Sequence, residues 1–146
     1  MSKKIFLATD HGAFEQKEAI KKFLIDEGYE VEDLGTHSTD SCHYPEYAIA
    51  LAKAVQKEGR GILLCGSGIG VCMVANKFKG IRAALCHSVD LARLSREHNN
   101  ANVICFGGRI SSSEEVLAMT KVWLATEFEG GRHQTRIDMF TDLGEN

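Results

Sequence analysis

The chain has 146 residues, with 17 basic and 20 acidic side chains, a formal charge of −3 and 44% hydrophobic residues. This length and composition predict one domain, residues 1–146, with a single core. The slight acidity argues against a dedicated nucleic-acid binder, so we expect no nucleic-acid partner. No apolar run reaches the roughly 18 residues of a transmembrane helix and no signal-peptide pattern opens the sequence, so we expect no membrane partner and a cytoplasmic location.

The cysteines and histidines indicate free thiols rather than a metal centre. The five cysteines are odd in number, and Cys65, Cys86 and Cys105 sit in or at the end of apolar runs. This usage favours a reducing compartment. No Cys-x-x-Cys, His-x-x-x-His or His-Glu-x-x-His spacing occurs, so we expect no structural metal.

Short β-rich runs alternate with helical patterns along the chain. Five runs are expected to form strands, namely residues 5–8, 29–34, 62–65, 81–85 and 103–106. Most are continuously apolar, as buried parallel strands are. Helical spacing of apolar residues marks 48–55 and 113–128, with Pro45 suited to a helix start and Gly28 and Gly59 to helix ends. The alternation predicts a doubly wound, Rossmann-like α/β sandwich of three layers with a five-stranded parallel sheet.

The alternation ends after Phe128. Gly130 and Gly131 are followed by a basic cluster and a short tail that could form one more helix. Residues 129–146 are therefore expected to be a C-terminal helical extension.

Ligands of a parallel sheet bind beyond the carboxyl ends of its strands, so the residues after each strand are the candidates for a site. Residues 10–12, 66–70 and 107–109 follow the first, third and fifth runs. Three alternating glycines in 66–70 leave bare backbone N–H groups at a helix start, which suits an anion. The spacing is neither a dinucleotide fingerprint nor a P-loop, and a simple tight turn is the alternative interpretation.

Three side chains in these segments suit proton transfer. Cys65 precedes the glycine loop, whose N–H groups would stabilise a thiolate base or nucleophile, although a buried core cysteine is the alternative. Asp10 and His11 could move protons or hold hydroxyls, with a helix N-cap as the alternative for Asp10. His98 and Asn99 lie at a helix end that we expect to point at the site, and a packed core histidine is the other interpretation of His98.

Four donors follow or lie within glycine-containing segments: Arg109, Arg132, His133 and Arg136. Arginine forks match phosphate oxygens, so an acidic chain that clusters them is expected to hold a local anion. A solvated surface run is the alternative for Arg132 and Arg136.

Several motifs occur together, namely Asp10-His11-Gly12, Tyr44-Pro45, Cys65 to Gly70, Ala75-Asn76-Lys77, Glu97-His98-Asn99, Ala101-Asn102-Val103 and Glu129 to Gln134. In combination they resemble the type B ribose-5-phosphate isomerases of the ribose/galactose isomerase family, from about Lys4 to Arg136. The resemblance implies a Rossmann-like fold, no cofactor and no metal. It also implies a homodimer or dimer of dimers with shared active sites, in which residues 129–146 reach the partner subunit.

The resemblance further implies interconversion of D-ribose 5-phosphate and D-ribulose 5-phosphate through an enediolate, in the non-oxidative pentose phosphate pathway. Cys65 would move the proton between the reacting carbons, and His98 would help to open the furanose ring. The implied substrate-binding residues are Asp10, His11, Tyr44, Gly66, Ser67, Gly68, Ile69, Gly70, Asn99, Arg109, Arg132, His133 and Arg136. Val71 stands where one subgroup carries a catalytic glutamate, so the chain resembles the cysteine type.

Two other functions stay open at the level of sequence. One is a hexose-6-phosphate isomerase acting on allose 6-phosphate or galactose 6-phosphate. The other is a non-catalytic sugar-phosphate-binding module, against which Cys65 and His98 argue because binding a phosphate needs neither a thiolate nor a second titrating group.

Overall fold

Parallel strands form one sheet at the centre of the molecule. The computed structural model describes residues 3–146, and within them five strands lie in the order β2-β1-β3-β5-β4. The strands are β1 (Lys4–Thr9), β2 (Glu30–Asp33), β3 (Arg60–Cys65), β4 (Ala83–Leu85) and β5 (Val103–Gly107). Every neighbouring pair is parallel, which confirms the predicted sheet.

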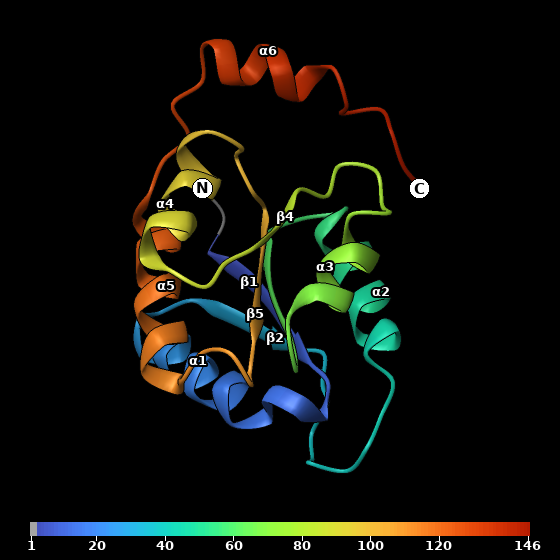
Figure 1. The fold of residues 1–146 in the computed structure, drawn as a ribbon, viewed down its shortest axis with the longest axis vertical. Helices are drawn as coiled ribbons and strands as arrows, with labels where there is room; N and C mark the ends of the chain where they lie inside the picture. Colours follow the sequence, from blue (N-terminus) through green and yellow to red (C-terminus); the bar gives the residue numbers. More distant parts are fainter. Residues whose placement is uncertain (1–2) are drawn as a thin grey trace.

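Helices cover both faces of the sheet and complete the predicted sandwich (Figure 1). They are the short 3-10 turn η1 (His11–Ala13), α1 (Phe14–Asp26), α2 (Tyr44–Val55), α3 (Ile69–Ala75), α4 (Val89–Glu97), α5 (Ser113–Ala125) and α6 (Arg132–Asp138). One apolar core lies between the sheet and α1, α4 and α5, and the second lies between the sheet and α2 and α3. The fully buried Trp123 of α5 belongs to the first core.

Short-range signals set several helix ends. Pro45 occupies the first turn of α2, where its missing N–H costs no hydrogen bond. Ser112 and Glu115 form a capping box at the start of α5. Gly28 and Gly59 have φ of +86° and +70° just beyond α1 and α2, as expected of helix-ending glycines.

A buried ion pair fixes the end of β2 against α1. Lys17 is fully buried, and its Nζ lies 2.8 Å from Asp33 Oδ2 and 2.8 Å from the Thr36 carbonyl oxygen. The Asp33 carboxylate also accepts hydrogen bonds from Lys21 and from the Gly35 N–H. Burial alone would raise the pKa of Asp33, but these donors outweigh it and the net pKa is lowered.

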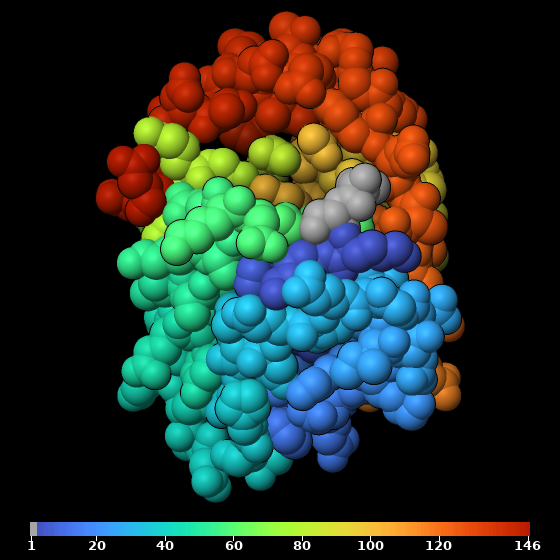
Figure 2. All heavy atoms as spheres, turned by 180° about the vertical axis from the view of Figure 1, so that it is seen from behind, coloured from blue at the N-terminus to red at the C-terminus, as the bar shows by residue number. Residues whose placement is uncertain are grey.

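The C-terminal segment lies at the amino-terminal end of the sheet. In Figure 1, α6 is at the top, while the loops that follow β1 and β3 are at the bottom. The tail returns to the sequence just before β4, where the Lys79 N–H donates to the Glu145 carbonyl oxygen at 2.7 Å. Figure 2 shows α6 and the tail in red above that segment, with a hollow between them. Among residues 3–146, no helix is long and apolar enough to cross a membrane.

Candidate active site

Cys65 ends β3 with its sulfur facing the glycine loop. The Gly68 N–H donates to Cys65 Sγ at 3.2 Å, and the residue is 5% exposed. Gly68 has a φ of +80°, and a Cβ there would lie 2.9 Å from the Phe106 carbonyl carbon, so only glycine fits. The loop therefore aims a backbone N–H donor at the Cys65 sulfur.

Three strand ends meet at this loop, as the sequence predicts. The Arg109 N–H donates to the Gly66 carbonyl oxygen at 2.9 Å. A Cβ built on Gly66 would lie 3.0 Å from Arg109 Nη1, and one built on Gly12 would lie 3.0 Å from the Gly66 nitrogen. The glycines thus allow the loops after β1, β3 and β5 to touch, and they bring an exposed guanidinium beside the Cys65 loop.

Asp10 and His11 have separate partners at the end of β1. Asp10 Oδ1 accepts the Gly12 N–H at 2.8 Å, so the N-cap interpretation of this carboxylate is correct, and its residue is 8% exposed. His11 Nδ1 lies 3.3 Å from the Cys42 nitrogen, whose N–H donates to it. Since Nδ1 accepts, the ring carries a proton on Nε2, and that N–H can donate to a ligand.

Tyr44 and Ser67 border the same loop. A Cβ on Gly70 would lie 2.5 Å from Tyr44 Cε1, so the aromatic ring rests directly on this glycine. Ser67 Oγ accepts the Ile69 N–H at 3.2 Å at the start of α3. The carboxyl end of the sheet therefore assembles the thiol, the Asp10-His11 pair, the glycine loop, Tyr44 and Arg109.

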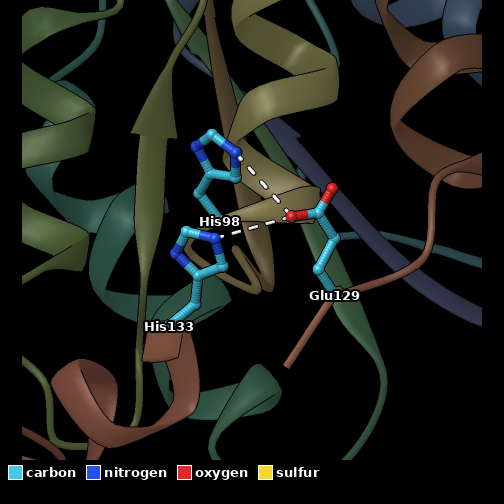
Figure 3. Close-up of side chains that lie close together, drawn as sticks. All are labelled: His98, Glu129 and His133. Carbon is cyan, nitrogen blue, oxygen red and sulfur yellow. Dashed lines mark ion pairs between the residues drawn. The ribbon is translucent and has the colours of Figure 1, made fainter. Parts of the chain in front are cut away.

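The remaining predicted site residues form a second cluster beside α6. A cavity of about 240 Å³ is lined by His98, Asn99, His133, Arg136, Ile137 and Phe140. The rings of His98 and His133 stack with centroids 4.4 Å apart. Between their edges, Glu129 Oε1 lies 3.5 Å from His133 Nε2 and 3.9 Å from His98 Nε2 (Figure 3).

Charge around this cluster favours an anion. Burial lowers the pKa of His133, and the positive charges of Arg132 and Arg136 lower it further, against the opposing effect of Glu129. His98, Glu129 and His133 offer ligand atoms within 4.8 Å of one another, the arrangement that comes nearest to a metal site among residues 3–146. The adjacent arginines would repel a cation there and would attract a phosphate.

The two clusters lie at opposite ends of the sheet. Cys65 pairs with Gly107 at the carboxyl end, whereas α4 runs back along the sheet and delivers His98 just before the start of β5. Five residues of β5 span about 16 Å. The expectation that the end of α4 points at the Cys65 loop of the same chain is therefore wrong, because a crossover helix runs antiparallel to its strands and ends where the next strand begins.

Two residues beside the site were not predicted from the sequence. Cys42 is half-buried with its sulfur 3.8 Å from His11 Nδ1. Glu129 faces both histidines, and only its spacing of four residues from His133 hinted at this contact. His98 is not a core histidine, since 40% of its side chain is exposed.

The structure is a Rossmann-like α/β sandwich with a cysteine at the carboxyl end of its sheet and a stacked histidine pair beside arginines at the amino end. The model of the Ribose/Galactose Isomerase family matches residues 5–140, and the chain belongs to this family.

Relatives and solved structures match over nearly the whole chain. Ribose-5-phosphate isomerase B of Escherichia coli is 44% identical over 97% of this chain and 96% of its own length. D-erythrulose-4-phosphate isomerase of Pectobacterium atrosepticum is 41% identical over 92% of this chain and 90% of its own. The structure of ribose-5-phosphate isomerase B from Mycoplasma genitalium with bound ribulose-5-phosphate has a TM-score of 0.93 and 42% identity, covering 94% of this chain and 93% of that one.

Proposed function

We propose that the chain interconverts D-ribose 5-phosphate and D-ribulose 5-phosphate through an enediolate. The observation that carries this proposal is the Gly68 N–H aimed at Cys65 Sγ inside the glycine loop. That geometry suits removal of a proton next to a carbonyl and stabilisation of the oxygen charge that results. The Mycoplasma relative, whose structure holds ribulose-5-phosphate, supports the choice of a pentose phosphate.

Each residue of the Cys65 cluster has a role in this reaction. The Cys65 thiolate takes the proton from C2 of the aldose and returns it to C1, while the hydroxyl proton of O2 passes to O1, and together these transfers convert the aldose to the ketose. Backbone N–H groups of the glycine loop other than those of Gly68 and Ile69, with the Ser67 hydroxyl, face the enediolate oxygens. Asp10 and the free Nε2–H of His11 hold sugar hydroxyls, and Tyr44 closes the pocket over Gly70.

The second cluster completes the site from a partner subunit in this proposal. This cluster lies at the end of the sheet opposite Cys65, so it has no direct role at the Cys65 of its own chain. The helix α6 lies outside the sandwich and carries exposed arginines. We therefore place His98, Asn99, Arg132, His133 and Arg136 of one copy against the Cys65 loop of another. His98 would open the sugar ring and the arginines would bind the phosphate. The chain then works as a homodimer or a dimer of dimers.

Proton removal by Cys65 is tested by comparing Cys65→Ala with a matched cysteine variant. Ketose formation from ribose 5-phosphate, measured in excess EDTA, should fall at least 10²-fold in Cys65→Ala, the usual effect of losing a positioned base. Cys72→Ala is the control. A hydrogen bond with Cys105 lowers the pKa of Cys72 to about 7, so Cys72 is a second reactive thiol that alkylating reagents would also modify. Full activity in Cys65→Ala would overturn the assignment.

Substrate length distinguishes the candidates within the family. We expect a higher kcat/KM for ribose 5-phosphate than for allose 6-phosphate or galactose 6-phosphate. The Pectobacterium relative adds a four-carbon phosphate, which makes three substrate lengths to compare. Binding of all three without turnover would instead support a sugar-phosphate-binding module. We also propose a place in the pentose phosphate pathway and a cytoplasmic location, consistent with five free thiols.

A further inference from the structure

Arg60 is a buried cation whose donors are incompletely used. It is the first residue of β3, is 8% exposed, and its Nε and Nη1 atoms have no hydrogen-bond partner among residues 3–146. Its guanidinium lies over the Trp123 ring, 5.3 Å from the centroid, and meets the Tyr29 hydroxyl. Buried guanidinium N–H groups without acceptors are costly, so an anion that came within reach of this side chain would relieve that cost.

Arg96 lies near both Arg60 and Arg82, and its hydrogen bonds go to neutral groups. Arg96 is 4% exposed and donates only to neutral oxygens, from Nη1 to Asn100 Oδ1 and the Ala101 carbonyl at 2.8 Å and from Nε to the Thr126 carbonyl at 3.2 Å. Burial lowers the pKa of Arg96, and the charges of Arg60 and Arg82 lower it further. Within residues 3–146 none of the three arginines forms an ion pair with a carboxylate.

A cavity of about 380 Å³ is lined by two of these arginines. Its lining residues are Gly59, Arg60, Arg96, Asn100, Asn102, Glu127 and Phe128. The volume is in the range of small-molecule sites, and guanidinium and amide donors are what a phosphate group needs. The one carboxylate in this lining, on the exposed Glu127, opposes an anion and limits its affinity.

We propose that this cavity is a second anion site, in which Arg60 and Arg96 bind a phosphate group, either as inorganic phosphate or as a small phosphomonoester. None of its lining residues belongs to the Cys65 cluster or to the cavity beside α6. The binding step stands independently of the isomerase activity.

The cavity lies between the two backbone segments that present the α6 cluster. Asn100 follows His98 and Asn99 directly, and Phe128 precedes Glu129. These segments are tied together by the Glu129 N–H, which donates to the Glu97 carbonyl oxygen at 3.1 Å, and by the bond from Arg96 to Thr126. A phosphate bound to Arg60 and Arg96 would hold both segments in place. If the proposed function holds, this would regulate how His98 and α6 contact the partner subunit.

Trp123 is the single tryptophan of the chain and lies against Arg60, so its fluorescence reports on this cavity. Inorganic phosphate, titrated at constant ionic strength with chloride, should produce a saturable change in the native protein. Arg60→Met keeps the unbranched stem over the indole and should weaken phosphate binding at least tenfold, as lost charge-assisted hydrogen bonds do. Arg93→Met, which removes an exposed arginine of α4 that pairs with Glu97, is the matched control and should bind as the native protein does.

Glu127→Gln is expected to bind phosphate more tightly, and misfolding would not produce that result. Removing the opposing carboxylate should tighten phosphate binding about two- to fivefold, the usual size of one exposed charge interaction. Calorimetric titration of the same variants counts the sites, and Arg60→Met should lose one phosphate site per chain. Glycerol phosphate in place of phosphate distinguishes an ester ligand from the free ion by which of the two binds more tightly.

Three results would overturn the site. They are a fluorescence change in native protein that never saturates or that chloride reproduces, equal phosphate affinity in native protein and Arg60→Met, and no gain in Glu127→Gln. None of these measurements uses turnover, so failure of the isomerase assignment would leave the result on the cavity intact.

Discussion

Mixing two inactive variants tests whether the active site combines residues of two subunits. Cys65→Ala removes the base at the carboxyl end of the sheet, and His98→Asn removes the imidazole about one strand length away at the amino end. Each variant alone should lose at least 10²-fold in ketose formation. In a mixed dimer, however, one of the two sites receives an intact Cys65 from one chain and an intact His98 from the other.

The expected recovery follows from symmetry. Random exchange of equal amounts gives about half mixed dimers, and each has one native site of two, so activity should return to about one quarter of the native value. The assay is ketose formation after the variants are unfolded together and refolded, with separately refolded variants as the control. A mixture as inactive as its components would show that Cys65 and His98 act within one chain or not together, and would refute the reasoning from sheet polarity.

Three further predictions concern the groups that hold the fold and the loop. Because the folded-state pKa of Asp33 is lowered, the stability from its pairing with Lys17 is fully present above the carboxyl's ordinary pKa of 3.8 and is lost as the pH falls through the lower folded-state pKa. Urea titrations at a series of pH values should show this loss. Asp33→Asn leaves Lys17 buried without its partner and should lower the free energy of unfolding by roughly 3–5 kcal/mol at pH 7. Ser112→Ala should cost about 1 kcal/mol in the same titration and leave kcat/KM unchanged, and a loss of activity there would contradict a purely capping role. Gly68→Ala places a Cβ 2.6 Å from Leu85 Cδ1 at a φ of +80°, so the N–H that faces Cys65 must move. We expect kcat to fall more than tenfold. A fully active variant would show that this N–H is dispensable.

The fold was largely predictable because buried parallel strands carry a strong local signal. The apolar runs before Cys65 and around Cys105 predict β3 and β5 closely. β2 and β4 are shorter than their runs, with bounds at Glu30–Asp33 and Ala83–Leu85, because they are the edges of the sheet and have one neighbouring strand each. The predicted helix over 113–128 stops at Ala125, where Thr126 becomes extended.

The site was predictable in its parts but not in its arrangement. Proximity after β1, β3 and β5 follows from sheet geometry, so the cluster of Asp10, His11, Cys65 and Arg109 could be expected. The direction of α4 also follows from topology, yet the motif around His98 indicates chemistry and says nothing of which end of the sheet presents it. Contacts across long sequence separations, such as Arg60 over Trp123, have no local signature.

The consequence of the Gly130-Gly131 pair reaches beyond this single chain. Both residues have positive φ, +72° and +60°, and a Cβ on either would meet nothing within 4 Å. Glycine is therefore needed at these positions for the backbone conformation, which sets the direction of α6, and not for lack of room. Another residue would adopt such a positive φ only at a cost of about 1–2 kcal/mol each. A change at these two positions would re-aim α6 while leaving the sandwich untouched, so in the proposed dimer these glycines would decide where the α6 arginines reach the partner subunit.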